Sequence, residues 1–246
     1  EETKGLLPLF ALSEQGYKRI IELSSMSYLA NDKLSEPYID FNELLSKNNG
    51  VAIFSGSING LFGQLFDKGK FDEIKNLYSK LKTKFSDTFY LEIQRHGDLN
   101  EAAFEKFNLL KSSELEIPII ATNEVFYINK EMHEAHDALI CIKNKTYVNE
   151  KNRIKFTDQH YLKTNSEMSE LFMDLPEALE NNYNLPYRCN FRPVPSKPIL
   201  PNISSDTIDI NDKLKKDSFN GLEKKFKTDR NLIKSLSNNI KIKEIY

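Results

Sequence analysis

The stretch Phe89-Tyr-Leu-Glu-Ile-Gln-Arg-His-Gly97 decides the fold class of this chain. Its first residues are mostly apolar, as in a strand buried on both faces, and the polar Arg95-His96-Gly97 follows directly. A pattern with helical spacing then runs from about Asn100 to Ser112. A buried strand, a polar turn and a helix make one βα unit, and such units pair their strands in parallel.

The same alternation of a short apolar run and a helical pattern occurs in three other places. The predicted strands are residues 6–12, 51–54 and 117–121, and the predicted helices are residues 14–28, 59–66, 71–85 and 130–142. On two helices we expect these residues to face the core: Tyr17, Ile20, Ile21 and Leu23, and then Ala103, Phe104, Phe107 and Leu110. Four consecutive βα units suit either an open doubly wound sheet or part of a barrel, so the fold class is α/β.

The sequence changes character after about residue 145. Apolar residues at helical spacing predict a helical segment over residues 166–182, which Pro176 breaks into two pieces. Five prolines then predict an extended linker over residues 186–206. A helix is predicted over residues 207–227, with Asp209 or Asn211 near its cap, and a further helix over residues 229–246. We therefore expect domains at 1–185, 186–206 and 207–246.

Composition excludes several classes of protein. The 246 residues are 39% hydrophobic and 28% charged, with a mean hydropathy of -0.52, which indicates a soluble globular protein and excludes a membrane protein. The formal net charge of -2 offers no excess of positive charge for non-specific nucleic-acid binding. Two distant cysteines favour a reducing cytoplasm. Glu1 replaces an initiator Met, and the last residues keep a helical pattern without a stop signal, so we expect both ends to be cut from a longer chain.

Motifs for common chemistries are missing from the sequence. It contains neither a G-x-x-x-x-G-K-[ST] phosphate loop nor a G-x-G-x-x-G motif. Gly56, Gly60 and Gly63 are spaced four and three apart, which is typical of turns and helix packing. Ser55-Gly56-Ser57 lacks the G-x-S-x-G elbow of a nucleophile, and Cys141 lies on the apolar face of a predicted helix, where it acts as a small hydrophobe.

The four histidines are the best candidates for a site. His96 directly follows a predicted strand, and the C-terminal ends of parallel strands face the active site in such folds. Asn123 and Glu124 follow the next strand, so His96 and Glu124 form a candidate metal fragment, one ligand short of a complete site. His133 and His136 share a helix face and could join His96 in a zinc site, although ordinary helix packing explains the pair better.

Four segments in order carry a resemblance to a known family: Tyr90-Leu-Glu-Ile-Gln-Arg-His-Gly97, Ile117-Pro-Ile-Ile-Ala-Thr-Asn-Glu124, Ala135-His-Asp-Ala-Leu-Ile-Cys-Ile142 and Glu167-Met-Ser-Glu-Leu-Phe-Met-Asp-Leu-Pro-Glu-Ala-Leu179. They resemble the alpha subunit of bacterial DNA polymerase III, over essentially the whole chain. The resemblance implies that residues 1–185 are part of a polymerase-and-histidinol-phosphatase (PHP) domain, a distorted (β/α)7 barrel with parallel strands whose N-terminal strands are missing. It also implies that residues 207–246 are the truncated helical start of the polymerase core.

The resemblance further implies a metal site in intact members of the family, where His, Asp and Glu at the strand ends bind Zn or Mn. The family's first ligands, an H-x-H motif, are not in this chain, and its RHG histidine is matched by His96. Its N-D-x-H motif falls on Asn123-Glu124-Val125-Phe126, so Glu124 replaces the Asp and Phe126 replaces the His. A phenyl ring has no lone pair to donate to a metal. We therefore expect a degenerate site with His96 and Glu124 as residual positions, and no cofactor in this fragment.

The resemblance places the polymerase active site, with its Mg-binding aspartates, downstream of residue 246. Asp206, Asp209 and Asp212 are explained by helix capping, so we expect no catalytic residue here. The leading hypothesis is a scaffold segment of a replicative DNA polymerase, which contacts other holoenzyme subunits, notably the proofreading exonuclease subunit, and reaches DNA only through regions outside this fragment. One alternative is a PHP-type metal-dependent phosphoesterase or proofreading exonuclease domain. The other is an unrelated α/β binding module.

Overall fold

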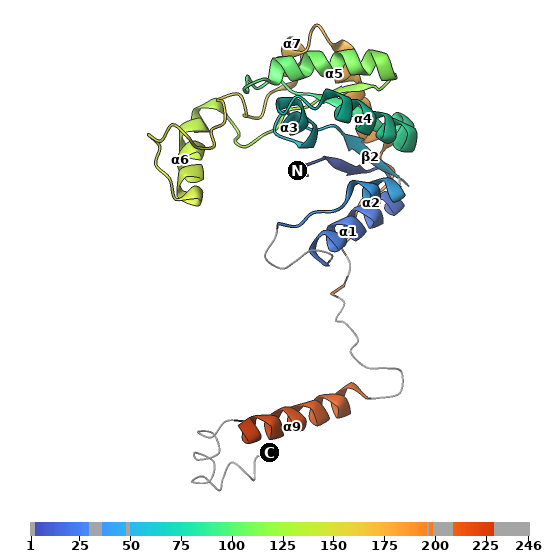
Figure 1. The fold of residues 1–246 in the computed structure, drawn as a ribbon, viewed down its shortest axis with the longest axis vertical. Helices are drawn as coiled ribbons and strands as arrows, with labels where there is room; N and C mark the ends of the chain where they lie inside the picture. The colour runs from blue at the N-terminus through green and yellow to red at the C-terminus, as the bar shows by residue number, and fades with distance from the viewer. Residues whose placement is uncertain (1–2, 30–35, 48–49, 196, 199–208, 229–246) are drawn as a thin grey trace. The chain divides into compact units, whose positions relative to one another are not determined.

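The computed structural model describes residues 3–29, 36–47, 50–195, 197–198 and 209–228 (Figure 1). The chain divides into two compact units, Glu1–Pro193 and Val194–Tyr246. The second unit contains helix α9 (Ile210–Thr228), and the Asp209 side chain accepts a hydrogen bond from the Asn211 N–H, as predicted for the cap. The helix predicted at 229–246 and the position of Asp206 lie outside the described residues.

The first unit is built on a four-stranded sheet with the order β1-β2-β3-β4. Its strands are β1 (Leu9–Ala11), β2 (Val51–Phe54), β3 (Phe89–Ile93) and β4 (Ile119–Ala121). Strands β2, β3 and β4 run parallel to one another, which confirms the mixed α/β class with parallel strands. The described strands form an open sheet, and closure into a barrel stays a prediction.

Strand β1 corrects the prediction of an all-parallel sheet, because it pairs with β2 in the antiparallel direction. The two are joined by a pair of helices, α1 (Glu14–Leu29) and α2 (Phe41–Ser46), instead of a single crossover helix. The Leu12 N–H donates to the Gly50 carbonyl over 2.8 Å, so the connection returns to the end of the sheet that it left. A chain that returns to the same end must enter the next strand in the opposite direction.

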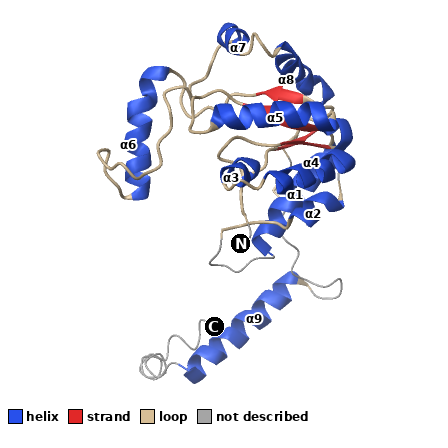
Figure 2. Ribbon diagram, turned by 45° about the horizontal axis from the view of Figure 1, so that its top comes forward, coloured by secondary structure: helices blue, strands red, loops and turns tan. Residues whose placement is uncertain are grey.

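The other helices follow the sequence pattern closely. They are α3 (Leu61–Asp67), α4 (Phe71–Phe85), α5 (Glu101–Leu115), α6 (His133–Asn144), α7 (Asn165–Leu171) and α8 (Pro176–Arg188), with short 3₁₀ turns at Ser86–Thr88 and Lys130–Met132 (Figure 2). Pro176 is the first residue of α8, so it separates two helices as predicted. None of the described helices is both long and apolar enough to cross a membrane.

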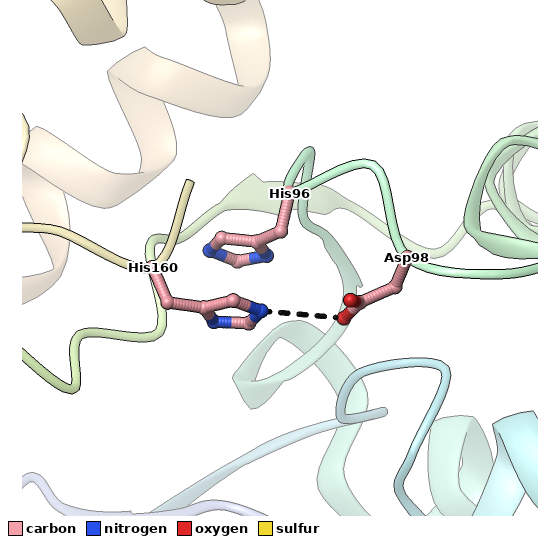
Figure 3. A group of neighbouring side chains, drawn as sticks. All are labelled: His96, Asp98 and His160. Atoms are coloured by element: carbon pink, nitrogen blue, oxygen red, sulfur yellow. Dashed lines mark ion pairs between the residues drawn. The ribbon is translucent and has the colours of Figure 1, made fainter. Parts of the chain in front are cut away.

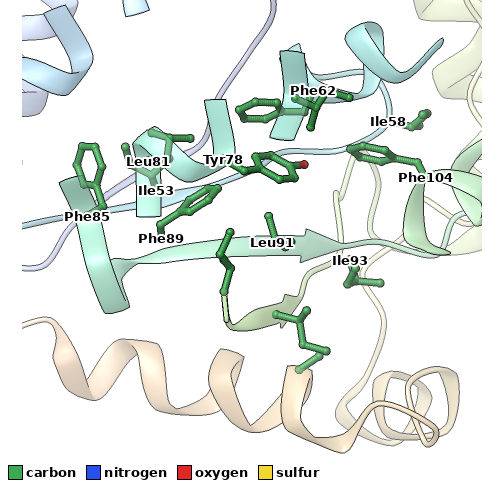
Figure 4. Close-up of a cluster of buried hydrophobic side chains, with 14 of the residues drawn as sticks. Ile53, Ile58, Phe62, Tyr78, Leu81, Phe85, Phe89, Leu91, Ile93 and Phe104 are labelled. Carbon is green, nitrogen blue, oxygen red and sulfur yellow. The ribbon is translucent and has the colours of Figure 1, made fainter. Parts of the chain in front are cut away.

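The main core lies between the sheet and helices α3, α4 and α5. Phe62 and Tyr78 of the helices meet Phe89 and Leu91 of β3, and all four side chains are fully buried (Figure 4). The opposite face of the strands carries a smaller cluster of Leu12, Ala52, Phe54, Tyr90, Ile120 and Leu185. Because successive strand side chains alternate between the two faces, both faces of β2 are apolar, and both faces of β3 are buried and apolar apart from Glu92.

Helix α8 covers the outer edge of β4. The side-chain amides of Asn181 and Asn182 donate to the carbonyl oxygens of Ile119 and Ala121 over 2.8 and 2.7 Å. These two carbonyls point away from β3, so the asparagines occupy positions where a further strand would pair. The helix also runs through Pro186 to Arg188, which corrects the prediction that an extended linker begins at residue 186.

Two predictions of inward-facing residues were wrong. On α1, Tyr17 and Ile21 are 37% and 48% exposed, whereas Arg19 is buried. Arg19 can be buried because its guanidinium pairs with Glu22 and Glu43 over 2.9 and 3.0 Å. On α5 the exposed Leu110 and Ala103 were expected inside, whereas Asn108 is buried beside the expected Phe104, and its Oδ1 accepts from the Tyr78 hydroxyl over 2.9 Å.

Candidate metal centre at the strand ends

His96 lies where the sequence predicts it, in the turn just after β3. Its side chain is 1% exposed, and protein atoms face both of its ring nitrogens. Nδ1 lies 3.3 Å from Oε1 of Glu101, at the start of α5. Nε2 lies 3.2 Å from the Glu124 N–H nitrogen and 3.1 Å from Oδ1 of Asn123, in the turn after β4. The backbone N–H groups of His96 and Gly97 also donate to Glu101, which fixes the whole turn.

His160 comes from a loop far along the chain and reaches the same place. Its side chain is fully buried. Nδ1 lies 3.2 Å from the backbone oxygen of Glu124, and Nε2 lies 3.4 Å from Oδ2 of Asp98 without forming a hydrogen bond. A parallel bridge between Tyr127 and Tyr161 and the hydrogen bond from the Phe126 N–H to the His160 carbonyl hold this loop against the strand ends.

The two imidazole rings stack face to face. Their centroids are 4.0 Å apart and their planes differ by 3°, so one ring lies directly over the other (Figure 3). The stack continues through Phe126, whose ring centroid is 5.0 Å from that of His160, and then to His136 on α6 at 5.4 Å. A column of four rings therefore connects the end of β3 with α6.

These side chains match a metal site in composition only. His96, Asp98 and His160 offer ligand atoms that all lie within 4.8 Å of one another, and imidazole with carboxylate suits zinc or manganese. A metal bound to an imidazole lies near the plane of the ring, along the nitrogen lone pair. An ion about 2 Å from a nitrogen of each ring would have to lie in the space between the two stacked rings, and so well out of the plane of both. The arrangement therefore does not fit a metal held by both histidines.

Glu92 of β3 is a further buried ionisable group beside this site. Its Oε1 accepts hydrogen bonds from Thr122 and Gln94, whereas Oε2 is buried without a partner. Burial raises the pKa of this carboxyl above its usual range, and the nearby negative charge of Glu124 raises the pKa further. Such a carboxyl keeps its proton to a higher pH than an exposed one.

Comparison with known proteins gives the site its context. Residues 1–96 match the PHP domain family. DNA polymerase III subunit alpha from Caulobacter vibrioides is 36% identical over 195 residues, which are 79% of this chain and 17% of that protein. The subunits from Rickettsia bellii and Vibrio cholerae are 35% and 33% identical, over 90% and 89% of this chain and 19% of each relative.

The chain is a homologue of DNA polymerase III subunit alpha. It spans less than a fifth of the length of these curated relatives. The match to the PHP family confirms that this alpha-subunit homologue contains a PHP domain, and it ends at residue 96, in the turn after β3. The predicted extent of that domain to residue 185, and the boundaries at 186–206 and 207–246, stay predictions, except that residues 186–188 belong to α8 and not to an extended linker.

The alpha-subunit homologue uses its two predicted metal positions differently. His96 belongs to the group of ligand-type side chains described above. Glu124 does not join that group with its carboxylate, and instead touches both stacked histidines through its backbone N–H and carbonyl. Phe126, where the resemblance predicts that intact members have a histidine, is 37% exposed and packs between His136 and His160. The degenerate metal site, with His96 and Glu124 as residual positions, stays a prediction.

Sequence reasoning missed Asp98 and His160. Asp98 stands two residues after His96, so its place in the same turn could have been noticed. His160 carries no such signal, because the loop before Tyr161 has no periodic pattern to fix where its side chain lies. The alternative zinc site with His133 and His136 is not formed in the described part of the chain: His133 lies 3.0 Å from the Phe156 carbonyl oxygen, and His136 stacks on Phe126.

The raised pKa of Glu92 predicts how stability depends on pH. The folded state holds the Glu92 proton where the unfolded chain has lost it, so the free energy of unfolding falls as the pH rises above about 4.5, the ordinary value. Glu92→Gln keeps the acceptor for Thr122 and cannot ionise. We expect this variant to gain stability over the native chain as the pH rises from 4 to 8. Urea unfolding at several pH values checks this, with the exposed Glu177→Gln as the control; parallel curves for Glu92→Gln and the native chain would contradict it.

Proposed function

We propose that this chain is a structural part of a bacterial replicative DNA polymerase alpha subunit, with a PHP domain that acts as a scaffold and carries no metal-dependent activity. The single observation that carries the proposal is the stack of His96 on His160. Parallel rings cannot direct their lone pairs at one ion, and both nitrogens of His96 already face protein atoms. The ring stack supports a packing role for side chains that a working site would direct at metals.

The whole protein is proposed to catalyse DNA-directed DNA synthesis, as the names of the relatives suggest. Nucleotidyl transfer of this kind needs clustered aspartates that hold Mg²⁺, and we place these outside the 246 residues of this chain. The proposed partners are other subunits of the polymerase III holoenzyme, notably the proofreading exonuclease subunit, with DNA bound by other regions of the protein. A cytoplasmic location is proposed, consistent with two free cysteines.

A second candidate function is a PHP-type phosphoesterase or proofreading exonuclease. The observation that favours it is the proximity of His96, Asp98 and His160, together with the unpaired Nε2 of the buried His160. That function requires one imidazole to rotate out of the stack. It also requires the histidines to give up the contacts that they now make, His96 with Glu101 and His160 with the backbone oxygen of Glu124.

Metal analysis separates the two candidates. After extensive dialysis and reloading with Zn²⁺ or Mn²⁺, the chain is expected to hold less than a stoichiometric amount of either ion, and to release no phosphate from a phosphoester. Mass spectrometry of the metal content and a phosphate-release assay measure both properties. One tightly bound equivalent that is lost in both His96→Ala and His160→Ala would favour the phosphoesterase.

The double variant Phe126→His with Glu124→Asp tests whether added ligand side chains can create a metal site. It restores the family's side chains but leaves His96 stacked on His160, so we expect no metal-dependent rise in melting temperature. Loss of the phenyl ring should instead lower the free energy of unfolding by about 1 kcal/mol, since Phe126 contacts the rings of Phe156, His136 and His160. Thermal melts with and without Mn²⁺ decide; a rise of several degrees with Mn²⁺ would show that a usable site persists.

A further inference from the structure

The second half of α6 and the loop after it, residues 139–155, expose an unusual amount of apolar surface. Five large apolar side chains within this segment are more than half exposed: Leu139, Ile142, Tyr147, Val148 and Ile154. Helix α6 stands away from the sheet in Figure 1, and Cys141 is its one buried residue. Exposed apolar side chains that gather in this way are typical of interaction sites. We call residues 139–155 the α6 surface.

One arginine links the loop of the α6 surface to helix α6. The guanidinium of Arg153 binds both carboxylate oxygens of Asp137 on α6, over 2.5 and 2.6 Å, and its side chain is 3% exposed. The same group donates to the carbonyl oxygens of Val148 and Ile154 over 3.0 and 3.2 Å. The bidentate bond lowers the pKa of the Asp137 carboxyl, so the pair stays charged near neutral pH. A surface that is already ordered loses little entropy when a partner binds.

The charge of the α6 surface is opposite to that of the whole chain. Lys143, Lys145, Lys151 and Lys155 are exposed, and Glu150 is the single acidic residue in the segment. Arg153 is neutralised by Asp137, so the solvent-facing side chains carry a net charge of +3, whereas the whole chain carries -2. The lysines alternate in sequence with the exposed apolar residues, which gives apolar contacts with positive charge around them.

The mixture of side chains favours a protein partner over a nucleic acid. Single-stranded nucleic acid binds by stacking its bases on aromatic rings, and Tyr147 is the one aromatic side chain of this surface that is largely exposed. The four exposed aliphatic side chains match no group of a nucleic acid backbone. They match the apolar face of an amphipathic helix, and the lysines match acidic residues beside that face.

We propose that the α6 surface docks an acidic amphipathic helix of a protein partner. The apolar face of that helix covers Ile142, Tyr147 and Ile154, and its carboxylates meet the lysines around them. This docking is independent of the scaffold role proposed for the strand ends, because none of the side chains of this surface takes part in the contacts of His96 or His160.

The experiment uses the full chain and three fluorescent probes. One is a 20-residue amphipathic peptide with leucines on one helical face and glutamates on the other, the second has the same composition in scrambled order, and the third is a 20-nucleotide oligo-dT. Fluorescence anisotropy at low and moderate salt measures binding. We expect the amphipathic peptide to bind at least tenfold more tightly than the scrambled peptide, and more weakly as salt increases.

Two variants locate the binding. Lys143→Glu with Lys151→Glu should weaken binding of the amphipathic peptide at least tenfold, and Ile142→Ser should weaken it without changing its salt dependence. The control, Lys80→Glu with Lys106→Glu, makes the same charge change on α4 and α5 and should leave binding unchanged. Equal binding of the two peptides, or equal loss in the control, would overturn the proposal. So would tighter binding of oligo-dT that the same variants abolish, which would indicate a nucleic-acid surface.

Discussion

Replacing Arg95 with alanine is expected to lower the free energy of unfolding by about 2 to 4 kcal/mol. The Arg95 guanidinium makes five hydrogen bonds to three different segments. It binds both carboxylate oxygens of Glu105 on α5, both carboxylate oxygens of Asp174 before α8, and the carbonyl oxygen of Leu171 at the end of α7. It also lies 4.8 Å from the centre of the buried Phe172 ring. Removing it leaves the largely buried Glu105 carboxylate without its partner.

The effect of Arg95→Ala should depend on pH. Hydrogen bonds from Arg95 lower the pKa of the Asp174 carboxyl below its usual value of 3.8. The stabilisation from this pair is present above that value and is lost as the pH falls through the lowered pKa. The difference between the native chain and the variant should therefore be largest near neutral pH and smaller in acid.

Urea unfolding followed by circular dichroism measures the change for Arg95→Ala. Lys18→Ala is the matched control, since Lys18 pairs with Glu14 on the surface, where both side chains are more than 60% exposed. An exposed pair of this kind contributes about 0.5 kcal/mol or less. If both variants lowered the free energy of unfolding by a similar amount, the hydrogen bonds of Arg95 would stabilise the fold no more than an exposed ion pair does.

Replacing Asn181 and Asn182 with leucine together is expected to cost about 2 to 4 kcal/mol and to promote association of the chain. The two amides satisfy the carbonyls of Ile119 and Ala121 at the outer edge of β4. Leucine cannot donate a hydrogen bond, and it also keeps water away from carbonyls in a strand whose residues are all buried. An edge strand with free backbone groups tends to pair with other chains.

Two measurements test this second prediction. Urea unfolding gives the loss of stability, and light scattering at increasing concentration detects association. The control is Asn184→Leu on the same helix, because the Asn184 side chain is exposed and the substitution is of the same kind, with half the change in hydrophobicity of the double variant. Association in the control alone, or equal stability in both variants, would mean that α8 does not protect the sheet edge.

The strands and helices of the sheet could be predicted because they depend on local patterns. Helix α4 begins and ends at the predicted residues, Phe71 and Phe85, and Val51–Phe54 forms a strand as predicted. The break at Pro176 follows from its ring, which suits the first turn of a helix and is unfavourable in the middle of one. These features need only the spacing of apolar residues and the chemistry of one backbone position.

The errors arose where contacts between distant residues decide the structure. Arg19 replaced Tyr17 and Ile21 on the buried face of α1 because Glu43, on another helix, compensates its charge. Strand β1 runs antiparallel because the connection to β2 contains two helices, and no periodicity in β1 itself records that. In each case the missing information lies in a segment that is remote in sequence.

The candidate site divides in the same way. His96 could be placed at the end of a buried strand, and the similarity to polymerase alpha subunits could be seen, from the order of residues alone. The stacking of His160 on His96, and the use of the backbone of Glu124 instead of its carboxylate, became visible in the folded chain alone. The physical reason is that apolar spacing records which side chains are buried, whereas the direction of a ring or a lone pair is fixed by contacts that exist only after the chain has folded.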